Sequence, residues 1–368
     1  MRRCSFFIIQ WHITERCNLH CRHCYREAAS LKEMPFKELK QTFNQCLQLF
    51  KSLAIPKGEA RINIGGGEPF LNRDLFRLLG IMKRYSKDIK IQLMSNGYFI
   101  NDAVAKNLVK MNISSVQVSL EGLRDTNDSI RGKGSFDKIV NAVSILRKNN
   151  IITRVSLTLT RKNINEVEQL AVYLKSLGVK TFGIRRYVKA GQGKELKDFM
   201  LDPPELKNHY EKRMSLKKAL EKDRRFFITY GCEDAMFCAQ ASPSHQYACG
   251  IVTGHHLNIF TNGDILSCRR CPIVLGNVLR DSLLDVYFSS DKLWNLRNLN
   301  NSHLFCRKCS YFKYCLGGAK CISYSYFGNP FAPDPQCFRI FENLPKVNEF
   351  KKCSDKLRKP IRISGGCF

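Results

Sequence analysis

The sequence is short of acidic charge, of tryptophan and of long apolar runs. Among its 368 residues are 2 tryptophans and 32 acidic residues against 60 basic ones, which gives a formal net charge of +28. No apolar stretch approaches the roughly 18 residues that a membrane span requires. The apolar start at residues 6–9 ends at Gln10, lacks a small-residue cleavage site and is too short for a signal peptide. We therefore expect a cytoplasmic protein without membrane contact.

Cysteine is almost missing from a long central part of the chain. Of the 17 cysteines, only Cys46 lies between Cys24 and Cys232. Disulfides are rare in a reducing cytosol, and a disulfide scaffold would not leave so long a stretch with one cysteine. The composition, 44% hydrophobic and 25% charged, excludes a disordered or fibrous chain. The pattern predicts two separate metal-binding regions on one globular chain.

Strand-like and helix-like segments alternate through the first half. Apolar residues recur at helical spacing in 39–50, 136–146 and 167–177, with Ser135 expected to precede one helix and Gly178 to follow another. This alternation predicts an α/β fold, a partial (β/α)6 TIM-like barrel followed by a C-terminal cysteine-rich Fe–S domain. Function is then expected at the carboxyl ends of the strands. The expected strands are residues 6–14, 61–66, 89–95, 115–120, 152–160 and 181–186.

The chain changes character after the barrel. Residues 1–188 are expected to form the barrel, and 189–229 a charged bridge that is helical from about residue 205. Residues 230–341 are rich in cysteine, glycine and aromatic residues, and metal ligation is expected to supply stability there. Residues 342–368 form a basic tail.

The first cysteine motif is a triplet, Cys17-x3-Cys21-x2-Cys24. Three thiolates on a tight loop can hold three irons of a [4Fe–4S] cluster and leave the fourth iron open to a ligand. The alternative is a zinc site, in which His20 or His23 would be the fourth ligand.

The triplet after the first strand and Gly66-Gly67-Glu68-Pro69 after the second resemble the radical S-adenosylmethionine (SAM) enzymes. Three later motifs strengthen the resemblance, which covers roughly residues 6–186. They are Ser95-Asn96-Gly97, Val118-Ser119-Leu120-Glu121-Gly122 and Ile130-Arg131-Gly132-Lys133-Gly134-Ser135-Phe136.

The resemblance implies a role for each matching residue. Cys17, Cys21 and Cys24 would bind the [4Fe–4S] cluster, whose open iron would be chelated by the amino and carboxylate groups of SAM. Gly66, Gly67 and Glu68 would offer acceptors to the methionyl amino group, because glycine lets the backbone approach closely. Tyr25 would lie beside the adenine, and Asn96 and Ser119 near the ribose and methionyl end. Arg131 would pair with the SAM carboxylate.

The second cysteine region resembles the SPASM extension of these enzymes, which holds two auxiliary Fe–S clusters. The matching pattern is Cys249-x13-Gly263-x4-Cys268, then Cys306-x2-Cys309-x5-Cys315, and a last Cys337. It departs at one point, because Ala319 stands where the next cysteine is expected and Cys321 follows two residues later.

The resemblance assigns these cysteines to two clusters. Cys306, Cys309, Cys315 and Cys337 would hold the distal cluster, and Cys249, Cys268 and Cys321 the proximal one. For the fourth proximal ligand, Cys271 is the first candidate, followed by Cys238 and Cys232, and an open iron remains an alternative. A zinc ribbon is the alternative for the whole region.

Enzymes of this layout reduce SAM to methionine and a 5′-deoxyadenosyl radical, which removes a hydrogen atom from a substrate. The resemblance favours a peptide or protein maturase, with flavodoxin or ferredoxin as electron donor. Because the triplet begins at residue 17, we expect any leader-binding domain to be a separate protein. The alternatives are a small-molecule substrate, such as a tetrapyrrole or cofactor precursor, and a non-catalytic metal protein that docks nucleic acid.

Some features fit no motif. Lysine and arginine are spread along the chain, which indicates a solvated surface more than a nucleic-acid site. Cys46 is expected in the core of a helix. Glu121 and Arg185 are substrate-facing candidates at the strand ends. His255-His256 are expected to be surface histidines beside a strand, with a metal pair as the alternative. The cysteines that fit neither pattern are Cys4, Cys46, Cys353 and Cys367.

Overall fold

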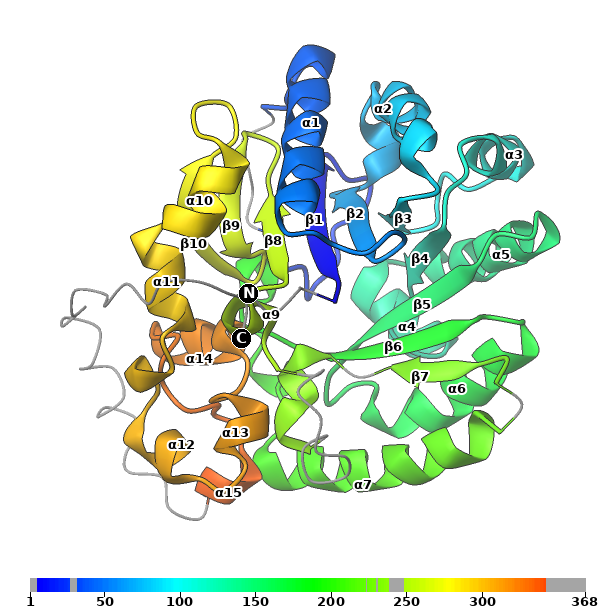
Figure 1. The fold of residues 1–368 in the computed structure, drawn as a ribbon. Coiled ribbons are helices and arrows are strands. Elements are labelled where there is room, and N and C mark those ends of the chain that lie inside the picture. Colours follow the sequence, from blue (N-terminus) through cyan, green and yellow to red (C-terminus); the bar gives the residue numbers. More distant parts are fainter. Residues whose placement is uncertain (1–4, 27–31, 223, 230, 238–247, 342–368) are drawn as a thin grey trace.

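The structure is a computed structural model that describes residues 5–26, 32–222, 224–229, 231–237 and 248–341. A ten-stranded sheet organises them, in the order β10-β9-β8-β1-β2-β3-β4-β5-β6-β7 (Figure 1). The strands from β8 through β1 to β7 run parallel to one another, whereas β9 runs antiparallel to both β8 and β10. The strands are β1 (Phe7–Thr14), β2 (Ala60–Gly66), β3 (Ile89–Ser95), β4 (Ser115–Ser119), β5 (Thr153–Leu159), β6 (Thr181–Arg186), β7 (Phe227–Thr229), β8 (His256–Ile259), β9 (Asp264–Cys268) and β10 (Cys271–Asn277).

The six expected strands are confirmed as β1–β6, each within one residue at either end. In β5, the buried apolar side chains Val155, Leu157 and Leu159 alternate with Ser156 and Thr158. Successive strand residues point to opposite faces, so one face meets the helices and the other lines the inside of the barrel. The inside is therefore polar, which suits a site for a polar ligand.

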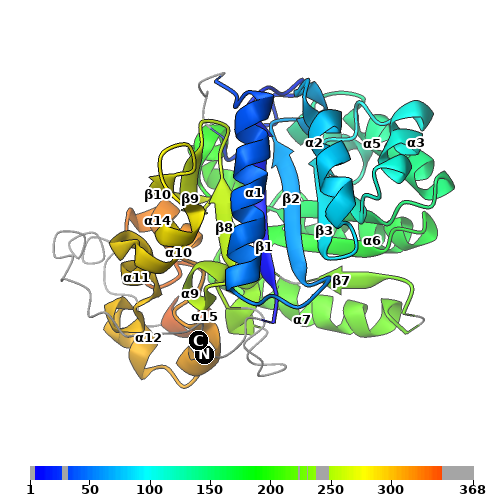
Figure 2. The same cartoon turned by 45° about the horizontal axis from the view of Figure 1, so that its top comes forward.

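Helices cover the outside of the sheet, and Figure 2 shows α1 and α2 lying along β1–β3. Cys46 is fully buried on the apolar face of α1, as predicted. The helices of the barrel are α1 (Phe36–Ser52), α2 (Leu75–Met82), α3 (Asp102–Lys110), α4 (Arg124–Arg131), α5 (Ser135–Lys148), α6 (Val167–Ser176) and α7 (Pro203–Leu220).

Two helix ends test the predicted start and stop signals. Gly178 follows α6 with φ of +73°, as predicted for a left-handed stop. The prediction that Ser135 precedes its helix is wrong, because Ser135 is the first residue of α5 and Gly134 is the cap. The Ser135 hydroxyl instead donates to Asp128 at 3.0 Å. Helix α7 begins with a reciprocal cap between Asp202 and Glu205.

The C-terminal part continues the barrel sheet through β8, which pairs with β1. One apolar core runs from Phe7 of the barrel to Ile322 of the cysteine-rich part. No helix in the described ranges is long and apolar enough to cross a membrane. The remaining helices are α9 (Gly250–Thr253), α10 (Leu283–Ser289), α11 (Asp291–Arg297), α12 (Leu304–Lys308), α13 (Phe312–Cys315), α14 (Lys320–Phe327) and α15 (Phe338–Phe341).

Candidate active site

A cavity of about 180 Å³ opens at the carboxyl ends of the parallel strands. Most residues predicted to bind the cluster and SAM lie in its wall. They are Cys17, Cys21, Cys24, Tyr25, Gly66, Gly67, Asn96, Ser119 and Arg131. The cavity is therefore where the sequence motifs converge, although they are far apart along the chain.

The glycine pair supports the cysteine loop by close backbone contact. The Gly67 amide donates to the Thr14 carbonyl at 2.8 Å, and the Glu68 amide donates to the Arg16 carbonyl at 2.8 Å. A Cβ atom on Gly66 or Gly67 would overlap the backbone of Thr14 or Arg16. Glycine is required there because the two backbones touch, which places Cys17 against the end of β2.

Asn96 joins the end of β3 to the cysteine loop. Its side-chain amide donates to the Asn18 side chain at 2.8 Å and lies 3.8 Å from the Cys17 sulfur. Its own backbone amide donates to the Glu68 carboxylate at 2.7 Å. Asn96 thus orients Cys17, and its predicted contact with SAM stays a prediction.

Glu68 is fully buried beneath the cavity and is absent from its lining. Its carboxylate accepts from the Ser95 hydroxyl at 2.9 Å as well as from the Asn96 amide. Burial raises the pKa of Glu68 to about 7, even though these hydrogen bonds act to lower it. The structure therefore shows this carboxylate supporting the end of β3, while the predicted contact with the SAM amino group stays a prediction.

The raised pKa of Glu68 predicts a pH-dependent stability. A carboxyl group whose folded-state pKa is raised contributes stability below its unfolded pKa of 4.5, and this stability is lost as pH rises through about 7. We expect the free energy of unfolding of reconstituted protein to fall by about 3 kcal/mol between pH 4.5 and pH 7.5 through this group. Denaturant titrations of Glu68→Gln should show a correspondingly flatter pH profile, and an unchanged profile would contradict the prediction.

The loop after β6 holds the other end of the cysteine triplet. The Gly193 amide donates to the Cys24 carbonyl at 3.2 Å, and the Gln192 amide donates to the Arg26 carbonyl at 3.2 Å. Gly191 has φ of +56°, and a Cβ atom there would overlap the Tyr25 backbone. The glycines that mark the end of the barrel in the sequence therefore hold the triplet in place.

Arg131 and Glu121 form a buried ion pair at the cavity wall, with 2.6 Å between Nη2 and Oε1. The same carboxylate lies 3.2 Å from Nε2 of His23 and accepts from the Thr158 amide at 2.6 Å. Burial alone would raise the pKa of Glu121, but His23 and Arg131 hold it at about 2. Arg131 also lies 3.8 Å from the Cys21 sulfur, so its guanidinium is shared between a carboxylate and a predicted cluster ligand. Its predicted contact with the SAM carboxylate stays a prediction.

Tyr25 lies between a histidine and an arginine. Its hydroxyl is 3.5 Å from Nε2 of His12, and the Arg269 guanidinium lies 5.1 Å from the centre of its ring. Burial and the charges of Arg269 and Arg26 lower the pKa of His12 to about 3, so His12 is neutral. An aromatic ring held in this way can stack against a planar base.

The three thiols of the triplet suit a metal cluster. Burial raises the pKa of the Cys21 thiol, and the neighbouring thiols of Cys24 and Cys17 raise it further, whereas Arg131 lowers it. Thiols that oppose one another's ionisation become thiolates together only when a positively charged centre offsets their repulsion. No three or more His, Cys, Asp or Glu side chains surround a single-ion position within the described ranges. In a cluster, each thiolate instead binds its own iron.

The C-terminal cysteines also fall into two groups. In the proximal group all of these cysteines are free, and the Cys232 thiol donates a hydrogen bond to Cys249 and the Cys321 thiol one to Cys268. Cys271 is fully buried, and burial and the charges of Cys268 and Cys249 raise the pKa of its thiol. Five thiols thus gather where four ligands are expected, so Cys232 and Cys271 both remain candidates for the fourth position. Cys238 lies outside the described residues, as do Cys4, Cys353 and Cys367.

The distal group contains the four cysteines that were assigned to it. Burial and the charges of Cys315, Cys337 and Cys309 raise the pKa of Cys306 to about 12. The pKa of Cys315 is raised to about 12 by burial and Cys337, while the amides of Gly317 and Gly318 donate to its sulfur. These mutual effects show that the four thiols are neighbours, which suits a second auxiliary cluster.

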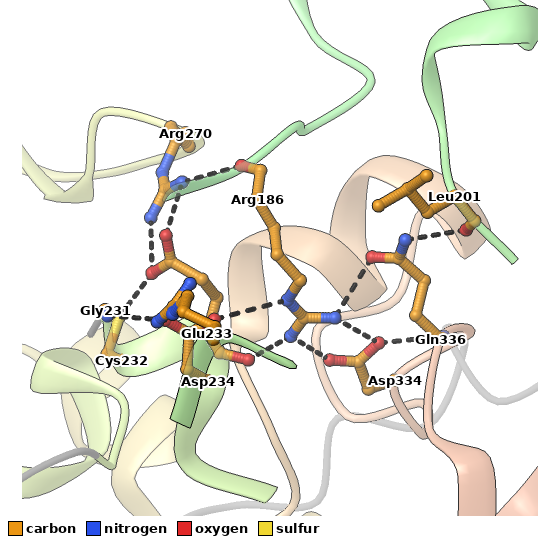
Figure 3. Close-up of polar contacts among 10 residues, drawn as sticks. Arg186, Leu201, Gly231, Cys232, Glu233, Asp234, Arg270, Asp334 and Gln336 are labelled. Atoms are coloured by element: carbon orange, nitrogen blue, oxygen red, sulfur yellow. Dashed lines mark hydrogen bonds and ion pairs between the residues drawn. The ribbon is translucent and has the colours of Figure 1, made fainter. Parts of the chain in front are cut away.

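A buried polar network connects the barrel with the cysteine-rich part, and sequence reasoning missed it (Figure 3). Arg186, at the end of β6, donates through Nη2 to Asp334 at 2.6 Å and through Nη1 to Gln336 at 3.0 Å. Its Nη2 also donates to the Glu233 carbonyl. Glu233 pairs in turn with Arg270 at 3.2 Å. These residues adjoin Cys232, Cys271 and Cys337, so the network fixes the cysteine groups relative to the barrel.

The structure also corrects the prediction for His255 and His256. His255 and His256 are half-buried, not surface residues. The His255 ring lies 4.4 Å from that of Phe6, and burial lowers the pKa of His255 to about 4. Their place beside β1 explains the burial, because β8 extends the sheet there.

Comparisons with known proteins agree with this geometry. The radical SAM superfamily model matches residues 11–174, and that of SPASM, an iron-sulfur cluster-binding domain, matches residues 249–310. Mycofactocin maturase MftC of Mycolicibacterium smegmatis is 26% identical over 89% of this chain and 82% of its own length. AdoMet-dependent heme synthase of Methanosarcina barkeri is 23% identical over 90% of this chain and 95% of its own.

Two solved structures share the fold. Native anSMEcpe with bound AdoMet superposes with a TM-score of 0.73 at 18% identity, covering 93% of this chain and 96% of the other. SuiB of Streptococcus suis bound to S-adenosylmethionine superposes with a TM-score of 0.72 at 19% identity, covering 91% of this chain and 78% of the other. The cofactors are accordingly SAM, a radical SAM [4Fe–4S] cluster and SPASM auxiliary Fe–S clusters. The chain belongs to the radical SAM superfamily, as an enzyme whose C-terminal part is a SPASM domain.

Proposed function

We propose that this enzyme modifies a ribosomal peptide or a protein by removing a hydrogen atom from it. The observation that carries the proposal is the match along nearly the whole chain to mycofactocin maturase MftC. Two structures with the same fold were solved with peptides, anSMEcpe with the Cp18Cys peptide and SuiB with the precursor peptide SuiA. A separate leader-binding protein and a flavodoxin or ferredoxin donor are the partners that this proposal implies.

The chain's own residues would hold the cofactors and shape the reaction space. Cys17, Cys21 and Cys24 would bind the cluster, with Arg131 beside the sulfur of Cys21. When bound, the cluster and SAM together supply a 5′-deoxyadenosyl radical that abstracts a hydrogen atom from the substrate. The cavity wall combines barrel strand ends with the loop between β9 and β10, where Arg269 and Arg270 lie. This enclosure would orient the substrate and exclude water from the reacting atoms.

A tetrapyrrole is the second candidate substrate. The match to AdoMet-dependent heme synthase of Methanosarcina barkeri spans 95% of that protein's length. Fe-coproporphyrin III synthase of the same organism is 24% identical over 92% of this chain. Such a substrate would use the same cavity and the same cofactors.

The test compares substrates with reconstituted enzyme, SAM and a reductant under anaerobic conditions. One arm supplies the products of small open reading frames beside the gene, and the other supplies iron-coproporphyrin III. We expect one such peptide to accelerate 5′-deoxyadenosine formation and to lose mass corresponding to hydrogen atoms. Turnover of the porphyrin alone would replace the peptide proposal with the tetrapyrrole one.

A further inference from the structure

The cavity wall contains more arginines than there are carboxylates in ion pairs with them. Six arginines line it, and four of them pair with a carboxylate. The four pairs are Arg26–Glu15 at 2.8 Å, Arg131–Glu121 at 2.6 Å, Arg186–Asp334 at 2.6 Å and Arg270–Glu233 at 3.2 Å. Arg185 and Arg269 are left, and neither forms an ion pair within 4 Å among the described residues, although the charge of Arg185 also acts on Glu233 and Asp234.

Arg185 and Arg269 approach the cavity from opposite domains. Arg185 is the penultimate residue of β6, and its Nη1 atom is buried without a hydrogen-bond partner within the described ranges. Arg269 lies in the loop between β9 and β10, over the ring of Tyr25. Glu121 is the one carboxylate in the described lining, and Arg131 and His23 already engage it.

Another arginine lies near Arg185 but outside the cavity lining. Arg154 lies on β5 beside β6, and its guanidinium donates to neutral Gln92 at 3.2 Å. Burial lowers the pKa of Arg154, and the charges of Arg61 and Arg185 lower it further. Like charges repel strongly in a partly buried space, so an anion bound at Arg185 offsets part of this repulsion.

We propose that Arg185 and Arg269 form a subsite that binds a carboxylate of the substrate beside the adenine side of the SAM site. The planar guanidinium matches a carboxylate in two-point hydrogen bonding, which a lysine would not supply. This inference rests on the proposed function, because it names what the substrate presents to the cavity. The carboxylate belongs to an acidic residue or chain end of a peptide, or to a propionate of a tetrapyrrole.

The test uses anaerobically reconstituted enzyme and paired probes that differ in carboxylate charge. Coproporphyrin III and its tetramethyl ester form one pair, measured by porphyrin fluorescence. A capped Gly-Glu-Gly peptide and its Gln counterpart form the other, measured as competitors or by ligand NMR. We expect wild-type enzyme to prefer the charged member of at least one pair about tenfold, and Arg185→Gln and Arg269→Gln to lose that preference.

The control variant is Arg73→Gln, an exposed position that should keep the preference. SAM affinity and 5′-deoxyadenosine formation without substrate should stay within about twofold of wild type in Arg185→Gln, which does not contact Tyr25. Equal binding of charged and neutral probes, or unchanged binding by both variants, would overturn the inference. A matching loss of SAM affinity in Arg185→Gln would overturn it too, since Arg185 would then serve SAM. If wild-type enzyme cleaves no SAM at all, the proposed function fails instead.

Discussion

Replacing Cys21 with alanine is expected to reduce 5′-deoxyadenosine formation at least ~100-fold, to background. The thiol is one of three in the triplet, and its sulfur is 3.8 Å from the guanidinium of Arg131. Two remaining thiolates cannot hold a cluster with a single open iron, and losses at metal sites exceed the 10–100-fold typical of outer-shell changes. Iron should fall from about 12 to about 8 per chain while the auxiliary clusters remain.

The matched control is Cys46→Ala, which removes a thiol from the buried face of α1. It should keep iron content and SAM cleavage, with a modest loss of stability from the smaller side chain. SAM cleavage that persists in Cys21→Ala would reject the assignment of the triplet. Equal loss in both variants would show that the chain does not tolerate cysteine removal.

Replacing Arg186 with methionine is expected to cost about 3–5 kcal/mol of unfolding free energy. The guanidinium is 2% exposed and holds Asp334 by two hydrogen bonds, so its removal leaves a buried carboxylate without compensation. Asp234 would be destabilised as well, because burial already raises the pKa of that carboxyl to about 6 and the charge of Arg186 acts to lower it. Because Asp334 lies three positions before Cys337, cluster content should also decline.

Chemical denaturation under anaerobic conditions measures this effect, and Arg124→Met is the control. Arg124 pairs with Asp137 at an exposed site, so its removal should leave stability unchanged within error. The double variant Arg186→Met with Asp334→Leu should recover part of the loss, since no isolated charge remains at that pair. A single variant as stable as wild type would show that the network adds nothing to folding.

The barrel could be predicted because the sequence pattern of each strand lies within a few consecutive residues. Each strand from β1 to β6 carries enough apolar residues to be recognised, and the site motifs follow directly at the strand ends. The strands β7 and β8 were not foreseen, because segments as short as Phe227–Thr229 carry almost no pattern. Their place in the sheet is set by pairing with β6 and β1.

The support of the site could not be predicted, because its contacts are distant along the chain. Arg186 bonds to residues 47 and 148 positions away, and no local motif signals such pairs. The predicted contact of the Glu68 carboxylate with SAM stays a prediction, and its support of Asn96 from beneath was not signalled by the motif. Sequence motifs identified which residues gather at the cavity, but whether a polar group faces the ligand or its neighbours depends on packing.

The strand order has a consequence for any attempt to divide the enzyme. Because β8 pairs with β1, removing the SPASM part would turn β1 into an edge strand with free backbone groups. Unprotected edges invite pairing with other chains, and β1 leads directly into the cysteine triplet. A radical SAM half produced alone should therefore aggregate or lose its cluster loop. The SPASM part thus protects the edge of the barrel sheet through β8, whatever its clusters contribute to electron transfer.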